Sequence, residues 1–145
     1  MFVGLQASGK TTFFRERFAA SHVHVSKDLF RRARNRERRQ ARLIEEAFRA
    51  AKSVVLDNTN PSRESRRAAI ALGRSLSARV VGYYFESRFA LSLERNRRRE
   101  GALRVPDAAL KATASQLERP SLGEGFEELW YVSIVDGSFV VEPWN

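Results

Sequence analysis

Cysteine is absent from the sequence of 145 residues, which also contains only one methionine and four prolines. Without cysteine, disulfide bonds and thiolate metal sites are excluded, and the redox compartment cannot be inferred. Long hydrophobic runs are missing as well, since an apolar stretch such as residues 80–85 has only the length of a strand and cannot span a bilayer. Because no signal peptide is recognisable, we expect a cytoplasmic protein that does not contact a membrane.

Acidic residues are scarce relative to basic ones, with 17 Asp and Glu against 26 Lys and Arg and a formal net charge of +9. Most of the basic residues are arginine, which suits planar, bidentate contacts with phosphate. This composition favours an anionic partner larger than a nucleotide, although a general preference for arginine over lysine explains it equally well. Without repeats or a low-complexity linker, residues 1–145 are expected to form a single domain.

Residues 4–11 read GLQASGKT and match the motif G-x-x-x-x-G-K-[ST] of a P-loop. A short apolar strand end precedes the motif, and Phe14 and Phe18 follow it at helical spacing. In such a loop the backbone N–H groups bind anionic oxygens, the lysine reaches the β and γ phosphates of ATP, and the hydroxyl holds Mg²⁺. The predicted nucleotide-binding residues are Gly4, Ala7, Ser8, Gly9, Lys10, Thr11 and Thr12.

Two aspartates follow predicted strands. Residues 53–57 form a buried run that ends in Asp57, which we predict to be the Walker B acid and a Mg²⁺ ligand together with Thr11. Asp28 follows the strand predicted at residues 22–25. Because the carboxyl ends of parallel strands meet at one edge, both aspartates and the P-loop are expected on the same rim.

The strand at residues 22–25 carries both histidines of the chain, His22 and His24, on one side. A metal site would need a third ligand, and none is evident in the sequence. We therefore expect the two histidines on the more solvated face of this strand.

Elsewhere, helical and strand patterns alternate. A break is possible near Asn35, and Asn60 followed by Pro61 is read as a helix start. The Asp136-Gly137 turn indicates a hairpin with an antiparallel edge strand. We expect helices over residues 12–18, 29–52, 61–76, 87–101 and 106–120, and strands over 2–3 (unusually short), 22–25, 53–57, 79–85, 129–135 and 139–141. The predicted fold is a three-layer α/β/α P-loop kinase-like sandwich with a mainly parallel five-stranded sheet and a possible short antiparallel edge strand.

Several strings occur in an order that resembles the kinase domain of polynucleotide 5′-hydroxyl kinases, as found in polynucleotide kinase-phosphatases and related bacterial ATP-binding proteins. The string DNTNP at residues 57–61 is the most specific of them, because P-loops occur in many unrelated ATPases. The sequence departs from the family at Gln6 and Ala7, which replace a common Pro-Gly, and at Lys27, where arginine is frequent. The other matching strings are VSKDLFR at 25–31, RN at 95–96, VP at 105–106, RP at 119–120 and EGF at 124–126.

The resemblance implies roles for individual residues. Lys10 and Thr11 would handle ATP and Mg²⁺, and Asp28 would be the general base that accepts the proton of the acceptor hydroxyl. Arg31 would clamp the acceptor's phosphate, and either Arg95 or Arg99 would be the lid arginine over the nucleotide. The predicted acceptor-binding residues are Arg31, Asn58, Thr59 and Asn60.

Three functions are compatible with these observations. The first is transfer of the ATP γ-phosphoryl group to a hydroxyl, most readily the 5′-hydroxyl of a nucleic acid. The second is a small-metabolite or nucleoside kinase on the same fold, and the third is a nucleotide-dependent nucleic-acid-binding module with little catalysis. The absence of a guanine-reading N-K-x-D string argues against a GTPase switch.

Simpler interpretations exist for the charged residues. Asp28 is also suited to cap a helix starting at Leu29. The basic segment of residues 31–42 is expected to contact an oligonucleotide backbone, but its charge alone fits a solvated helix face nearly as well. Arg95 and Arg99 are also compatible with a cationic helix C-terminus that complements the helix dipole.

Overall fold

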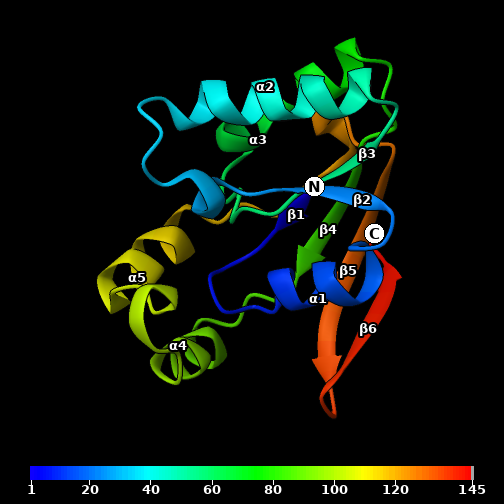
Figure 1. Ribbon diagram of the computed structural model, residues 1–145. Coiled ribbons are helices and arrows are strands. Elements are labelled where there is room, and N and C mark those ends of the chain that lie inside the picture. Colours follow the sequence, from blue (N-terminus) through cyan, green and yellow to red (C-terminus); the bar gives the residue numbers. More distant parts are fainter. Residues whose placement is uncertain (145) are drawn as a thin grey trace.

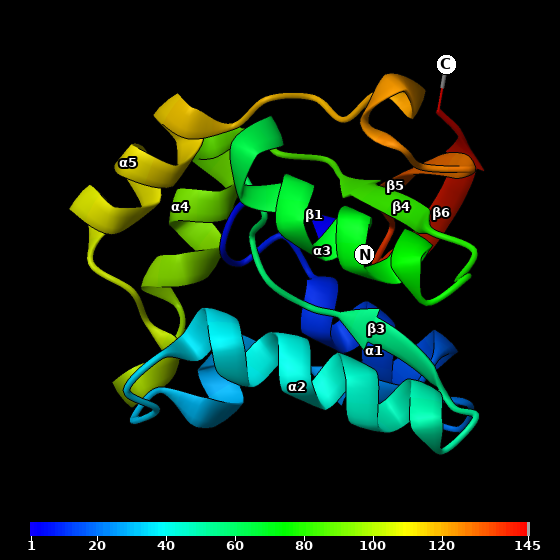
Figure 2. The same ribbon diagram turned by 90° about the horizontal axis from the view of Figure 1, so that it is seen from above.

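Helices cover both faces of a central layer of strands in the computed structural model, which describes residues 1–144 (Figures 1 and 2). Helix α1 lies on one face of the strands, and α2 and α3 lie on the other. The α-helices are α1 (Lys10–Arg17), α2 (Arg36–Arg49), α3 (Arg63–Ser75), α4 (Phe89–Arg97) and α5 (Asp107–Gln116), with short 3₁₀ helices η1 (Lys27–Phe30), η2 (Gly101–Leu103) and η3 (Leu122–Glu124). The strands are β1 (Phe2–Val3), β2 (His22–Val25), β3 (Ser53–Leu56), β4 (Val81–Phe85), β5 (Glu128–Val135) and β6 (Ser138–Pro143). The predicted three-layer α/β fold is confirmed.

The strands form two hydrogen-bonded sheets rather than the predicted single five-stranded sheet. One has the order β1-β4-β5-β6, and the other is the pair β2-β3. All pairings are parallel except that of β5 with β6, which confirms the antiparallel edge strand. The hairpin between them turns at Asp136 and Gly137, whose φ angles of 50° and 77° fit a turn that needs two left-handed residues.

The division between the two sheets follows from the length of β1. Its two residues pair with β4 on one side only. Toward β3, the chain is joined by a hydrogen bond from the Gly4 N–H to the Thr59 carbonyl at 3.0 Å. The side-chain amide of Asn60 donates to the Phe2 carbonyl at 2.7 Å. These bonds replace a regular ladder and place the P-loop beside the end of β3.

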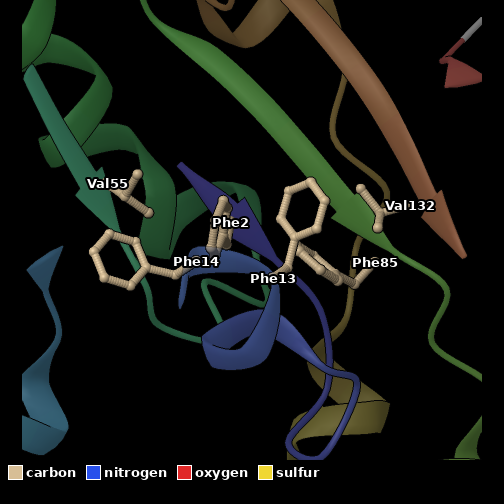
Figure 3. Close-up of a cluster of buried hydrophobic side chains, with 6 residues drawn as sticks. All are labelled: Phe2, Phe13, Phe14, Val55, Phe85 and Val132. Carbon is tan, nitrogen blue, oxygen red and sulfur yellow. The ribbon is translucent and has the colours of Figure 1, made fainter. Parts of the chain in front are cut away.

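The core between α1 and the strands is largely aromatic (Figure 3). The ring of Phe2 lies 5.8 Å from that of Phe13 and 5.1 Å from that of Phe85, and all three side chains are buried. Burial of a large apolar side chain contributes about 1.5–3 kcal/mol. This cluster fixes α1, and therefore the P-loop at its start, against the sheet.

Side-chain caps set the starts of two helices. Helix α2 begins after Asn35, whose Oδ1 accepts from the Arg38 N–H at 3.0 Å, which confirms the predicted break. The predicted cap at Asn60 is wrong, because α3 begins at Arg63 with Ser62 as its cap. Asn60 is instead a left-handed residue, with φ 44°, whose amide is bonded to Phe2.

A buried ion pair joins α3 to η3. The guanidinium of Arg66 is fully buried and donates to both carboxylate oxygens of Glu124, at 2.7 and 2.9 Å. It also donates to the carbonyls of Asn60 and Pro61, at 2.9 and 3.0 Å. Burial alone would raise the pKa of Glu124, but the hydrogen bonds from Arg66 and Ser121, together with the positive charges of Arg66 and Arg63, lower this pKa. The pair therefore holds the turn after β3 in place.

Within residues 1–144, no helix is both long and apolar enough to cross a membrane.

Candidate nucleotide and acceptor site

The P-loop connects β1 to α1 through a strained backbone. Gly9 precedes α1 with φ 95°, a conformation that glycine adopts without cost. Ala7 has φ 59°, which costs an alanine roughly 1 kcal/mol more than a glycine. Ala7, which replaces a glycine common in the family, therefore has a strained backbone conformation. The Leu5 N–H donates to Ser87 Oγ at 3.2 Å, which ties the loop to the end of β4.

Lys10 is folded back into the loop. Its ammonium donates to the carbonyls of Gly4 and Leu5, at 3.0 and 2.5 Å, and to Ser8 Oγ at 3.3 Å. Burial lowers the pKa of Lys10 to about 8, although the charge of Asp57 opposes this shift. Phosphate oxygens bound in the loop would raise this pKa again, because they favour the charged ammonium group of Lys10.

Thr11 and Asp57, the two predicted Mg²⁺ ligands, are in direct contact. Thr11 Oγ1 donates to Asp57 Oδ2 at 2.8 Å. Among residues 1–144, no cluster of three or more His, Cys, Asp or Glu side chains is arranged to hold a metal ion. A hydroxyl and one carboxylate nevertheless fit Mg²⁺, which prefers hard oxygen ligands and takes its remaining ligands from water and nucleotide phosphates.

His24 contacts this site in a way that the sequence interpretation missed. Its Nε2 lies 2.9 Å from Asp57 Oδ2, and its ring stacks on Phe14 with centroids 4.1 Å apart and planes 15° apart. The signal was available in the strand pairing. In parallel register His24 lies opposite Val55, and Asp57 is two residues further along on the same face.

Asp28 lies in η1, but it does not cap this helix. The cap is Ser26, whose Oγ accepts from the Asp28 N–H at 3.3 Å. The Asp28 carboxylate is 76% exposed and forms an ion pair with the Arg31 guanidinium at 3.4 Å. The interpretation of Asp28 as a helix cap is therefore wrong, and its carboxylate is available at the mouth of the site.

The three residues that follow Asp57 make contacts within the fold. The Asn58 amide accepts from the Lys27 N–H at 2.9 Å and donates to Gln40 at 2.8 Å, so it holds η1 beside α2. Thr59 accepts from Gly4 through its carbonyl, and Asn60 is buried with its amide bonded to Phe2. The amide nitrogens of Asn58 and Asn60 are thus occupied by protein groups, and both side chains fix the segment that follows β3.

Helices α4 and α5 lie together at the P-loop end of the molecule (Figures 1 and 2), and Gln6 Nε2 bonds to Thr113 Oγ1 of α5 at 2.9 Å. Between these helices, residues 98–104 form a loop that contains η2 and is closed at its base by Asn96, whose amide group bonds to both the N–H and the carbonyl of Val105. Arg99 on this loop lines the site, and burial lowers its pKa, opposed by Asp28. Arg95 lies on α4 and is not among the residues that line the site.

These groups surround one cavity of about 420 Å³. The P-loop and the residues after β3 line this cavity, together with residues of η1 and of the α4–α5 loop. The cavity is also lined by Arg15, from α1, which the sequence did not single out, and by Arg36, from the start of α2, which belongs to the basic segment of residues 31–42. The lining residues with predicted roles are Ala7, Gly9, Lys10, Thr11, Thr12, Asp28, Arg31, Asp57, Asn58, Thr59, Asn60 and Arg99.

A basic groove lies along the first half of α2 and has a volume of about 590 Å³. Arg36, at the start of the same helix, lines the main cavity, and the groove and the cavity share no lining residue. The groove is lined by Ala33, Arg34, Asn35, Arg38, Arg39, Ala41, Arg42 and Glu45.

Comparisons with known proteins identify a family and a fold for this chain. Residues 1–120 match the protein family described as "AAA domain" (AAA_33). The whole chain is 25% identical to part of the bifunctional polynucleotide phosphatase/kinase of Schizosaccharomyces pombe and spans 36% of the length of that protein. Kti12 of Chaetomium thermophilum, solved in complex with ADP-AlF3, has the same fold, with a TM-score of 0.66 and 16% identity over 91% of this chain and 87% of Kti12.

Proposed function

The chain belongs to the AAA domain family, here a P-loop kinase-like domain, and from this premise we propose that it transfers the γ-phosphoryl group of ATP to the 5′-hydroxyl of a nucleic acid. The observation that carries the proposal is that Lys10, Asp57 and Asp28 line one cavity with Arg31 and Arg99. A phosphate-binding loop alone would serve any NTPase. A carboxylate and an arginine placed opposite it provide for a second substrate that carries both a hydroxyl and a phosphate.

In the proposed reaction the acceptor oxygen attacks the γ-phosphorus, the bond to the β-phosphate oxygen breaks, and ADP leaves. Mg²⁺ held by Thr11 and Asp57 would neutralise charge on the phosphates. Asp28 orients the acceptor hydroxyl and takes its proton as the new bond forms. Lys10 and Arg99 stabilise negative charge on the transferring group.

The ion pair between Asp28 and Arg31 suggests how the acceptor engages. In the ligand-free chain the two side chains neutralise each other at 3.4 Å. A phosphate of the acceptor would bind the Arg31 guanidinium, for which it is a strong bidentate partner. Asp28 would then be free to accept a hydrogen bond from the neighbouring hydroxyl.

The basic groove on α2 supports a polymeric acceptor. Its arginines lie on the helix whose first residue, Arg36, lines the cavity, and a nucleic-acid backbone presents phosphates at regular intervals that such arginines can neutralise. The relative from Schizosaccharomyces pombe is described as a polynucleotide phosphatase/kinase, which favours the same acceptor class over a small metabolite.

Acceptor screening tests this function. Radiolabelled γ-phosphate of ATP is followed into 5′-hydroxyl DNA, 5′-hydroxyl RNA, nucleosides and sugars in parallel. We expect transfer to an oligonucleotide and its loss in Lys10→Ala, while Lys111→Ala, which removes an exposed lysine of α5 outside the cavity, remains active. Transfer only to nucleosides or sugars would favour a small-molecule kinase, and release of phosphate to water alone would contradict a kinase.

Salt dependence tests the groove separately. Each single-strand phosphate that the groove neutralises should add about −0.7 to the slope of log affinity against log salt concentration. Arg38→Ala and Arg39→Ala should make this slope less steep. Arg67→Ala, an exposed arginine of α3 outside both the groove and the cavity, is the matched control. An affinity that does not change with salt would contradict contact with a backbone.

A further inference from the structure

We propose that His24 is a positioning residue that orients the Asp57 carboxylate for Mg²⁺, an inference that rests on the proposed nucleotide chemistry of the site. Asp57 Oδ2 accepts two hydrogen bonds, from Thr11 Oγ1 at 2.8 Å and from His24 Nε2 at 2.9 Å. The contact with Thr11 follows from the P-loop and Walker B pattern. The contact with His24 does not, because no motif at this site calls for a histidine on the neighbouring strand.

Two contacts restrict the orientation of the His24 side chain. The backbone of His24 lies in the β2–β3 ladder, opposite Val55. The face of its ring stacks on Phe14 of α1, with centroids 4.1 Å apart and planes only 15° apart. Rotation of the ring is therefore restricted, and Nε2 stays directed toward Asp57.

The hydrogen-bond inventory determines what His24 does. An ionised carboxylate only accepts hydrogen bonds, so the proton must lie on Nε2 of His24. The Thr11 hydroxyl has a single proton, which it also gives to Asp57, and it keeps its oxygen lone pairs for a cation. His24 thereby supplies a donor that does not itself need to bind the metal, and it holds the Asp57 side chain, which is only 4% exposed, in one orientation.

Groups that orient a metal ligand commonly change metal affinity or activity by about 10–100-fold when they are removed. We expect His24→Phe, which retains a ring to stack on Phe14 but has no donor, to weaken Mg²⁺-dependent nucleotide binding by at least about tenfold. His24→Gln can place an amide N–H near the position of Nε2 and should recover part of this loss. Binding of ADP in the presence of a chelator should be nearly the same in all three proteins, because Lys10 and the loop remain unchanged.

The test measures ADP affinity by calorimetry across a Mg²⁺ titration, without an acceptor, together with the melting temperature. His22→Phe is the matched control, since His22 lies on the same strand and its Nδ1 is bonded to Ser21 rather than to Asp57. An unchanged Mg²⁺ midpoint in His24→Phe, with or without a lower melting temperature, would overturn the inference. The same titration of the wild-type protein tests the proposed cofactor separately. If ADP binding by the wild-type protein did not respond to Mg²⁺, both the proposed cofactor and the proposed role of His24 would be wrong.

Discussion

Replacement of Asp28 by asparagine separates the proposed chemistry from the fold. Asparagine has nearly the same size and still forms hydrogen bonds, but it cannot accept a proton as a carboxylate does. A carboxylate is a much weaker base than an alkoxide, so Asp28 cannot ionise the acceptor beforehand and must act as the new bond forms. In a loose phosphoryl-transfer transition state the nucleophile carries little charge early, which is compatible with such a late proton transfer.

The structure predicts little change in stability for this variant. The Asp28 side chain is 76% exposed, and its ion pair with Arg31 is an exposed contact worth about 0–1 kcal/mol. The cap of η1 is Ser26 and remains. Loss of a general base slows a reaction by about 10² to 10⁴, which corresponds to roughly 3–5 kcal/mol of barrier. The expected loss in rate is therefore several times larger, in free energy, than the expected loss in stability.

Single-turnover transfer from labelled ATP to a 5′-hydroxyl oligonucleotide measures this rate, with ATP affinity and melting temperature recorded beside it. Glu37→Gln is the matched control, because Glu37 is a similarly exposed carboxylate that pairs with Lys27 and does not line the cavity. We expect at least about a hundredfold slower transfer for Asp28→Asn and a near-normal rate for Glu37→Gln. Near-normal transfer by Asp28→Asn would remove Asp28 from the mechanism, and an equal loss in both variants would point to a general effect of charge.

Three further predictions follow from the site and its supports. Burial lowers the pKa of Lys10 to about 8, and bound phosphate favours the charged ammonium, so above that pH ATP binding should take up a proton and the affinity should fall as the pH rises. Calorimetry in buffers of different ionisation enthalpy measures the proton uptake. An ATP affinity that stays constant from neutral to clearly alkaline pH would contradict this prediction. Arg99→Ala should slow single-turnover transfer by at least about tenfold more than Arg95→Ala, since only Arg99 lines the cavity; equal rates in the two variants would reject this assignment of the lid arginine. Arg66→Met should leave Glu124 buried without its partner and lower the free energy of unfolding by about 3–5 kcal/mol, measured by urea denaturation. Adding Glu124→Gln to this variant should recover part of the loss. A loss below about 1 kcal/mol would contradict the prediction and mean that water or another group compensates the carboxylate.

Much of the architecture was readable from local patterns. The P-loop motif, the buried strand that ends at Asp57 and the Asp136-Gly137 turn each depend on residues that are neighbours in sequence, so their local conformation follows from backbone sterics and hydrogen bonding. The alternation of strands and helices then implied a mostly parallel sheet with its ligand edge at the carboxyl ends. The structure has this fold, and it brings Asp28 and Asp57 to the same cavity as the P-loop.

The predictions of the Asn60 cap and of a single sheet were wrong because they depend on hydrogen bonds between residues that are distant in sequence. Asn60 has the side chain and position of a helix cap, but the short strand β1 leaves the Phe2 carbonyl without a ladder partner, and the Asn60 amide bonds there instead. The same shortness divides the predicted single sheet. Ser62 could then cap α3 because the helix begins two residues later than expected.

The sequence by itself determined which residue types make up the P-loop and follow the strands, and in which order they occur, because a motif specifies local backbone and chemistry. Only the tertiary structure decided which of these residues contact one another or line the cavity. Arg95 and Arg99 are equivalent in a sequence pattern, yet the loop closed by Asn96 brings only Arg99 to the cavity. His24 looks like one of two solvated histidines until the β2–β3 register and the ring of Phe14 direct it to Asp57. Both outcomes depend on the packing of segments far apart in the chain, which no local pattern encodes.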